Sequence, residues 1–454
     1  MSLSKILSSP LLLHVARLPF QVKQHIQLNR TLFLNASSLV ATTAVTSVLG
    51  FAYWWLAARL YPPEAVGFAS AAISAMMLLG AMGMLGLGTV LIGEVSRQPN
   101  HAGSIIVMSA LIVGGASSAL GILFALAVPT LSPELALVSQ DLGSIVVFAV
   151  GVAFTAVTFI LDQAFVGLLR GGLQLWRNII FAAAKLILLY VIAYHLSQTT
   201  GLSIYAAWMF GNILSLVILA AYMLWRRIRI VYRPQFGLIR RIGRTALAHH
   251  TTNLILQAPN LLLPIAVTTL LSASANASFY AAWMIASFLF VIPGHLTTVL
   301  YAVGSKEPAA LIARTRMTLR LSLAITLPMA AILFIMANVL LGLFGAHYAE
   351  QADWCLRILS LGVFPLIVKY HYIAFLRVYN RVDSAIAILL LSGICEIGLS
   401  AFGLITGGLT GLAIGWVTAA CLEAIVMWFK LSEMMRANDI NMDHELANVQ
   451  TGAV

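Results

Sequence analysis

The chain has 454 residues, of which 61% are hydrophobic and only 9% are charged, and its mean hydropathy is +0.96. Soluble globular proteins are about 45–50% apolar and about 25% charged, so no soluble core could bury this excess and the surrounding solvent must be lipid. The net charge of +11 would suggest nucleic acid in a soluble protein, but here the basic residues lie between apolar segments and indicate membrane topology instead.

Twelve apolar segments follow one another along the chain, each long enough to cross about 30 Å of hydrocarbon as a helix. They are expected at residues 36–58, 66–92, 104–128, 143–167, 178–195, 203–225, 247–270, 279–303, 320–344, 356–376, 384–404 and 409–430. The apolar runs are continuous, whereas membrane strands would alternate. The sequence therefore predicts an all-α integral membrane protein with about 12 transmembrane helices.

The distribution of lysine and arginine predicts the orientation in the membrane. With the N-terminus inside, cytoplasmic segments hold 22 of the 26 basic side chains, and only Arg59 and Arg357 lie in outer loops. We therefore expect a multi-pass protein of the inner (cytoplasmic) membrane with both termini in the cytoplasm. No cleavable signal peptide is evident.

The most basic segment divides the chain at its midpoint. Residues 226–246 contain seven arginines and no acidic residue. The predicted organisation is a cytoplasmic tail at 1–35, a six-helix bundle at 36–225, this basic cytoplasmic linker at 226–246, a second six-helix bundle at 247–430 and a cytoplasmic tail at 431–454. The linker fits a positive-inside segment that contacts anionic lipid headgroups. Alternatively, Arg240, Arg241 and Arg244 recruit phosphate at the inner mouth.

The two bundles show a weak internal repeat. A shift of 207 residues places Leu169-Arg170 on Leu376-Arg377 and Gly201-Leu202-Ser203 on Gly408-Leu409-Thr410, and a shift of 211 places Phe68 on Phe279. Repeated halves around a central pathway are typical of transporters. We therefore expect two pseudo-symmetric bundles around a central cavity.

A polar stripe runs along the seventh predicted helix. Its members are three or four residues apart and share one helical face: His249, Asn253, Gln257 and Asn260. Under the 211-residue shift the first helix carries a matching set: Ser38, Thr42 and Thr46. Buried amides cost several kcal/mol without partners, so the stripe must face protein or water. It predicts either two walls of a substrate cavity or hydrogen bonds that join helices.

Charged residues within the predicted spans are candidate functional groups. They are Asp162, Lys185, Lys369, Glu396 and Glu423. Asp162 and Lys369 are repeat equivalents, so they could form a buried pair or an ion-coupling site; otherwise Lys369 reaches the inner interface and Asp162 is neutral. The other three have no assignable partner. No metal, cofactor or catalytic motif is evident, and the three cysteines have no metal-binding spacing.

Several stretches carry a resemblance to a known family. They are the polar first helix followed by Ala58-Arg59-Leu60 and Pro62-Pro63-Glu64-Ala65-Val66-Gly67; Phe279-Tyr280-Ala281-Ala282 leading to Ile292-Pro293; Phe344-Gly345 with Tyr348; and Gly407-Gly408-Leu409-Thr410-Gly411-Leu412-Ala413. Together they resemble the polysaccharide flippases of the multidrug/oligosaccharidyl-lipid/polysaccharide exporter superfamily. The resemblance covers nearly the whole chain. It implies alternating access that moves a polyprenyl-pyrophosphate-linked oligosaccharide from the inner to the outer leaflet.

Two other functions stay open. A multidrug/cation antiporter of the same superfamily commonly keeps a carboxylate in the first or seventh helix, and both of these predicted helices lack acids. A polytopic enzyme of polysaccharide assembly would need catalytic groups outside, but the longest outer loop, 129–142, holds only Glu134 and Asp141. The expected partners are the lipid-linked oligosaccharide, anionic lipids, H+ or Na+ as coupling ion and other polysaccharide assembly proteins; neither enzymatic activity nor nucleic-acid binding is expected.

Overall fold

The computed structural model describes residues 41–98, 100–195, 199–227, 232, 243–304, 311–379, 381 and 385–451. Within these ranges the side chains of residues 89, 243–249, 252, 302–303 and 437–451 are not described. The described part of the chain is helical and contains no strand, as the continuous apolar runs predict.

The first half of the described chain consists of helices joined by short turns. A helix covers residues 41–60. It is followed by α4 (Pro63–Gly83), α5 (Leu87–Arg97), α6 (Ala102–Leu131), the 3-10 helix η1 (Pro133–Ser139), α7 (Leu142–Gly167), α8 (Gly171–His195) and α9 (Gly201–Trp225). Capping residues set several starts, because an oxygen side chain satisfies a free backbone N–H: Asp141 accepts from Ser144 N at 2.6 Å, and Thr200 accepts from Ser203 N at 3.3 Å.

The second half repeats this pattern with longer helices. It comprises α10 (Gly243–Leu270), α11 (Ala273–Gly304), α12 (Leu311–Gly342), α13 (Ala346–Leu361), α14 (Val363–Val378) and α15 (Ile386–Thr451). α15 is interrupted at Gly407 and Gly408, where Gly408 has φ +59° and ψ −146°. A side chain would be strained in that conformation, so the glycine allows one apolar helix to end and the next to begin.

The number of membrane-crossing segments agrees with the sequence. Nine helices of the described chain are long and apolar enough to span a membrane, and α13 with α14, bent by 41°, form a tenth. The helix over 41–60 and the division of α15 at its glycines bring the described segments to the expected twelve. The predicted all-α membrane fold is therefore confirmed.

Two predicted spans differ in their bounds. The span expected at 66–92 ends at Gly83, and Leu85 and Gly86 adopt positive φ before α5 begins. The span expected at 178–195 begins earlier, at Gly171, so Gln174 and Arg177 are part of it. The apolar run underestimated this helix because its first two turns carry polar side chains that are paired inside the protein.

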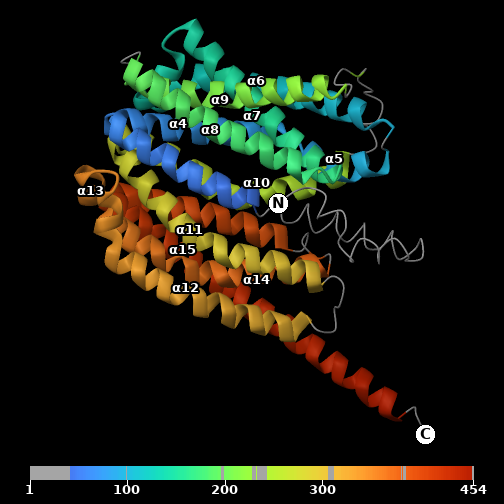
Figure 1. Cartoon of the computed structure of the whole chain (residues 1–454). Coiled ribbons are helices and arrows are strands. Elements are labelled where there is room, and N and C mark those ends of the chain that lie inside the picture. The colour runs from blue at the N-terminus through green and yellow to red at the C-terminus, as the bar shows by residue number, and fades with distance from the viewer. Residues whose placement is uncertain are drawn as a thin grey trace, which may run out of the picture.

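The helices of each half pack mainly on one another. α6 lies along α7 and α8 along α9 in the first half, whereas α12 packs on α13 and α14 on α15 in the second. Figure 1 shows the blue and green helices on one side and the orange and red ones on the other. Contacts between the halves run chiefly through α4, which touches both α10 and α11. The domain bounds expected from the sequence stay a prediction, and most of the basic linker lies outside the described residues.

The halves approach most closely where α4 meets α11. A Cβ on Gly67 would lie 1.6 Å from the carbonyl oxygen of Ala273, so only glycine allows this contact. Beside it, Asn276 of α11 donates to the Gly67 carbonyl at 2.8 Å and to Ser70 Oγ at 2.9 Å. Asn276 and Ser70 are fully buried. This contact, the α4–α11 contact, closes the gap between the halves at the end of the bundle that carries η1 and α13.

The orientation can be tested on this geometry. Thr200 and Glu134 are exposed at one end of the helices, and Arg226 is exposed at the other. In a background with Cys355, Cys395 and Cys421 changed to alanine, an impermeant maleimide is expected to label cysteines at Thr200 and Glu134 on intact cells. A cysteine at Arg226 should react only after permeabilisation. The reverse pattern would contradict the orientation expected from the basic residues.

Candidate functional site

Two adjoining cavities lie between the halves. The first has a volume of about 510 Å³ and is lined by α10, α11, α14, α15 and Thr43 of the helix over 41–60. The second has about 350 Å³ and is lined by the helix over 41–60, α4, α8, α9 and α11. Ser287 and Val291 of α11 belong to both linings. The two cavities therefore meet along α11 and form one candidate site with two chemically different ends.

The first cavity is polar on its α10 and α14–α15 sides. Gln257 and Asn260 of α10 line it, and Trp283 Nε1 donates to Asn260 Oδ1. Lys369 and Glu396 line it from α14 and α15, beside Trp416. Amides, an indole and a buried ion pair give this cavity both donors and acceptors, so it can bind hydroxyl-rich or charged groups.

An ion triad stands behind this wall. Lys369 Nζ donates to Glu396 Oε1 and lies 2.9 Å from Glu423 Oε2. Trp416 Nε1 donates to Glu396 Oε2 at 3.1 Å. All three charged residues are buried, at 9% exposure or less. Buried charges need partners, and this arrangement supplies one cation for two carboxylates.

The second cavity has a cation in an aromatic wall. Lys185 Nζ lies 3.5 Å from the centroid of the Trp208 ring, 4.8 Å from that of Tyr53 and 4.9 Å from that of Phe181. Lys185 is 4% exposed, and no carboxylate of the described residues lies within ion-pair distance. Ring faces attract a cation but do not neutralise it. The first-half end of the site therefore carries a positive charge that is not balanced by an acid of the described chain.

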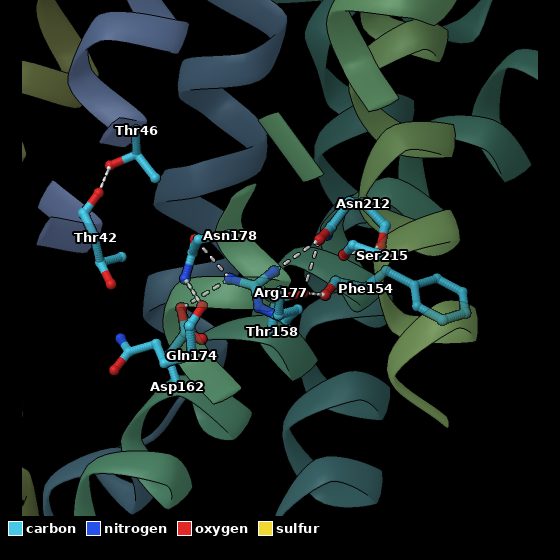
Figure 2. A network of polar contacts seen from close by, with 10 residues as sticks. All are labelled: Thr42, Thr46, Phe154, Thr158, Asp162, Gln174, Arg177, Asn178, Asn212 and Ser215. Atoms are coloured by element: carbon cyan, nitrogen blue, oxygen red, sulfur yellow. Dashed lines mark hydrogen bonds and ion pairs between the residues drawn. The ribbon is translucent and has the colours of Figure 1, made fainter. Parts of the chain in front are cut away.

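A polar network joins the second cavity to the core of the first half (Figure 2). Arg177, 2% exposed, donates to Asp162 Oδ2 at 3.0 Å and to Asn178 Oδ1 at 2.8 Å. Its other terminal nitrogen lies 3.5 Å from Asn212 Oδ1, which also accepts from Thr158 at 3.0 Å. Asn178 lines the second cavity. The network links α7, α8 and α9 and balances the Asp162 charge.

The structure places the predicted stripe residues in different surroundings. Gln257, Asn260 and Thr46 line the cavities, whereas Asn253 is exposed away from these linings and Thr42 is buried against its own helix, its carbonyl accepting from Thr46 at 2.7 Å. Ser38, Arg240 and Arg241 lie outside the described residues, as do the side chains of His249 and Arg244. A role of any of them in substrate or phosphate binding stays a prediction.

The pairing considered for Asp162 and Lys369 is wrong. Asp162 pairs with Arg177, and Lys369 pairs with Glu396 and Glu423. Glu396 and Glu423 thus have a partner that the sequence did not reveal, and Arg177 is a buried network member rather than a cytoplasmic loop charge. The partners lie on different helices at no fixed spacing. The only usable signal was an unusual density of charge in apolar helices.

An apolar groove adjoins the second cavity. It has a volume of about 300 Å³ and is lined by Phe51, Phe288 and residues of α11 and α12, among them Leu289, Leu333 and Leu340. Phe51 and Phe288 line both spaces. A polar chamber and an apolar groove therefore share one wall.

Comparisons with known proteins agree on the fold. Residues 251–402 match the MatE family model, and no curated protein matches the chain. An inward-facing structure of a multidrug resistance MATE family transporter of the MOP superfamily superposes with a TM-score of 0.72 at 16% identity, covering 88% of this chain and 98% of that one. An outward-facing structure of such a transporter gives 0.61 at 16% identity, covering 90% and 96%.

A third similar structure comes from Pyrococcus furiosus. This MOP superfamily transporter gives a TM-score of 0.56 at 14% identity, covering 91% of this chain and 96% of that one. It is described as having a binding pocket of reverse polarity that suggests a different function.

These findings define the chain as a multi-pass membrane protein with the fold of the MATE transporters of the MOP superfamily. The part that matches the MatE family model lies within its second half. Members of that family are transporters, which agrees with the expectation of a non-enzymatic function. The comparisons lie closer to the multidrug exporters considered as an alternative than to a polysaccharide flippase.

Proposed function

We propose that this protein is an alternating-access exporter of an anionic amphiphile, a polyprenyl-pyrophosphate-linked oligosaccharide. The observation that carries this proposal is the buried Lys185 at the wall of the second cavity, without a carboxylate partner among the described residues. An unbalanced buried cation is unfavourable on its own and is stabilised by an anion. A diphosphate supplies such an anion in a substrate that must cross hydrocarbon.

The surrounding spaces fit the other parts of that substrate. Gln257, Asn260 and Ser287 offer amide and hydroxyl groups to sugar hydroxyls in the first cavity. The apolar groove beside Phe51 and Phe288 offers hydrocarbon contact to an isoprenoid chain. A lipid-linked sugar needs all three environments next to one another, because its head must stay hydrated while its tail stays in lipid.

A multidrug/cation antiporter is the second candidate. The similar solved structures include multidrug resistance transporters, and the first cavity holds the carboxylate of Glu396 beside Trp283 and Trp416. A carboxylate among aromatic rings suits an organic cation. The two candidates therefore place opposite charges on the substrate, and they differ in which end of the site binds it.

The charge of Lys185 separates these candidates. In proteoliposomes, Lys185→Gln is expected to weaken binding of a fluorescent polyprenyl-diphosphate oligosaccharide about 10-fold to 100-fold, because a charge-assisted hydrogen bond contributes about 1.5–3 kcal/mol. Equilibrium binding and flipping rate measure the effect. Lys430→Gln serves as control, because Lys430 is an exposed lysine on α15.

Equal affinity in the two variants would contradict the proposal. Efflux of a cationic dye by the wild-type protein that is unchanged or faster in Lys185→Gln and lost in Glu396→Gln would instead identify the antiporter.

A further inference from the structure

The two halves neutralise their buried charges differently. In the first half Asp162 and Arg177 form a one-to-one pair, 3.0 Å apart. In the second half the single ammonium of Lys369 contacts two carboxylates, those of Glu396 and Glu423. The second half therefore has one more buried carboxylate than it has cations among these groups.

The geometry of the triad is that of a filled cation site. Three separate elements contribute: Lys369 comes from α14, Glu396 from the first part of α15 and Glu423 from the part beyond the glycine break. The ammonium lies between the two carboxylates. Trp416 holds the second oxygen of Glu396, so that carboxylate is oriented independently of Lys369.

Glu423 supplies a second, independent indication of a ligand. It is 6% exposed, and its Oε1 has no hydrogen-bond partner in the described part of the chain. A buried carboxylate oxygen without a donor is costly, because it has lost water and gained nothing. The site thus offers an acceptor that the Lys369 ammonium does not use.

We propose that Glu396 and Glu423 form a binding site for a monovalent metal cation, and that the Lys369 ammonium occupies the cation's place. Carboxylate oxygens are the ligands that hard cations prefer, and an ammonium is a compact point charge that can replace one. Lys369 and Glu396 line the first cavity, so an ion entering that cavity reaches the site directly. The wild-type protein is then independent of sodium at this site, and loss of the lysine exposes a sodium site.

The test needs no transport substrate, so its outcome is independent of the exported molecule. Purified Lys369→Ala is expected to bind about one radioactive sodium ion per chain, whereas the wild type binds none at this site. Sodium chloride should also raise the unfolding temperature of Lys369→Ala by about 2 °C or more over equimolar choline chloride, since a ligand that binds only the folded state stabilises it. Ammonium chloride should act in the same way by replacing the missing side chain.

Matched variants separate the site from a general salt effect. Lys369→Ala combined with Glu396→Gln and Glu423→Gln removes the ligands and should bind no sodium. Lys369→Arg keeps a cation in place and should stay sodium-independent. Sodium binding that is equal in the triple variant and in Lys369→Ala, or absent from a folded Lys369→Ala, would overturn the assignment.

A second measurement holds even where Lys369→Ala fails to fold. Glu423→Gln leaves the Lys369–Glu396 pair balanced, so both this variant and the wild type should show no sodium-specific shift in unfolding temperature. A sodium-specific stabilisation of the wild type that Glu423→Gln abolishes would show that sodium binds beside the lysine and would refute its role as the built-in cation.

Discussion

Replacing Gly67 by alanine is expected to open the α4–α11 contact, the largest conformational effect that a single methyl group can have in this protein. The added Cβ would lie 1.6 Å from the Ala273 carbonyl oxygen and 2.5 Å from its carbon. Both are backbone atoms that cannot rotate away, so the helices must separate. Asn276 then loses its bonds to Gly67 and Ser70. We expect a loss of about 1–3 kcal/mol from overpacking and a population shift towards separated halves.

The separation can be measured directly. Spin labels at the exposed positions Thr200 and Gln351, one in each half, should report a longer distance in Gly67→Ala by pulsed electron spin resonance. Gly398→Ala is the control, because nothing lies within 4 Å of a Cβ at that position of α15. That change should leave the distance unaltered and stabilise the helix slightly. An unaltered distance and stability in Gly67→Ala would contradict the role given to this contact.

Breaking the Asp162–Arg177 pair is expected to give the largest loss of stability. Asp162→Asn leaves the Arg177 guanidinium, 2% exposed, without its counter-charge, and Arg177→Met leaves Asp162 without its cation. Removal of one partner of a buried pair costs about 3–5 kcal/mol. The double change should cost less than the sum of the single ones, because no unpaired charge remains. Unfolding midpoints in detergent measure all three variants.

The Glu94–Arg97 pair provides the matched comparison. Its nitrogen and oxygen are 3.5 Å apart, and the arginine side chain is 79% exposed. The same double-mutant cycle there should give a coupling energy below about 1 kcal/mol. Additive effects at Asp162 and Arg177 would mean that the buried network does not depend on their charge.

The charges of the site suggest a common principle for both halves. Among the described buried groups, Lys185 gives the first half one positive charge in excess, and the second carboxylate of the triad gives the second half one negative charge in excess. The proposed substrate anion and the proposed cation site thus lie at opposite ends of the joined cavities. Each end can be removed separately, by Lys185→Gln or by Glu423→Gln.

The amino-acid sequence alone determined the solvent and the architecture of this protein. Twelve long apolar runs require lipid, and in lipid each run must satisfy its own backbone hydrogen bonds, so helices follow without knowledge of their neighbours. The break between the last two spans was also readable, because Gly407 and Gly408 interrupt the apolar run. The stripe on α10 was correctly recognised as a face, and two of its amides, Gln257 and Asn260, line the first cavity.

Only the tertiary structure decided which buried charges meet. Arg177 looked like a loop arginine until α8 extended past it, and Lys369 looked like a partner of Asp162 because the repeat aligned them. The actual partners come from neighbouring helices of the same half, Asp162 with Arg177 and Lys369 with Glu396 and Glu423. Helical periodicity fixes the face of a side chain relative to its own helix, but the rotation of one helix against another depends on packing across the bundle. A pair of ions in lipid is a property of that packing, and so is the glycine contact that joins α4 to α11.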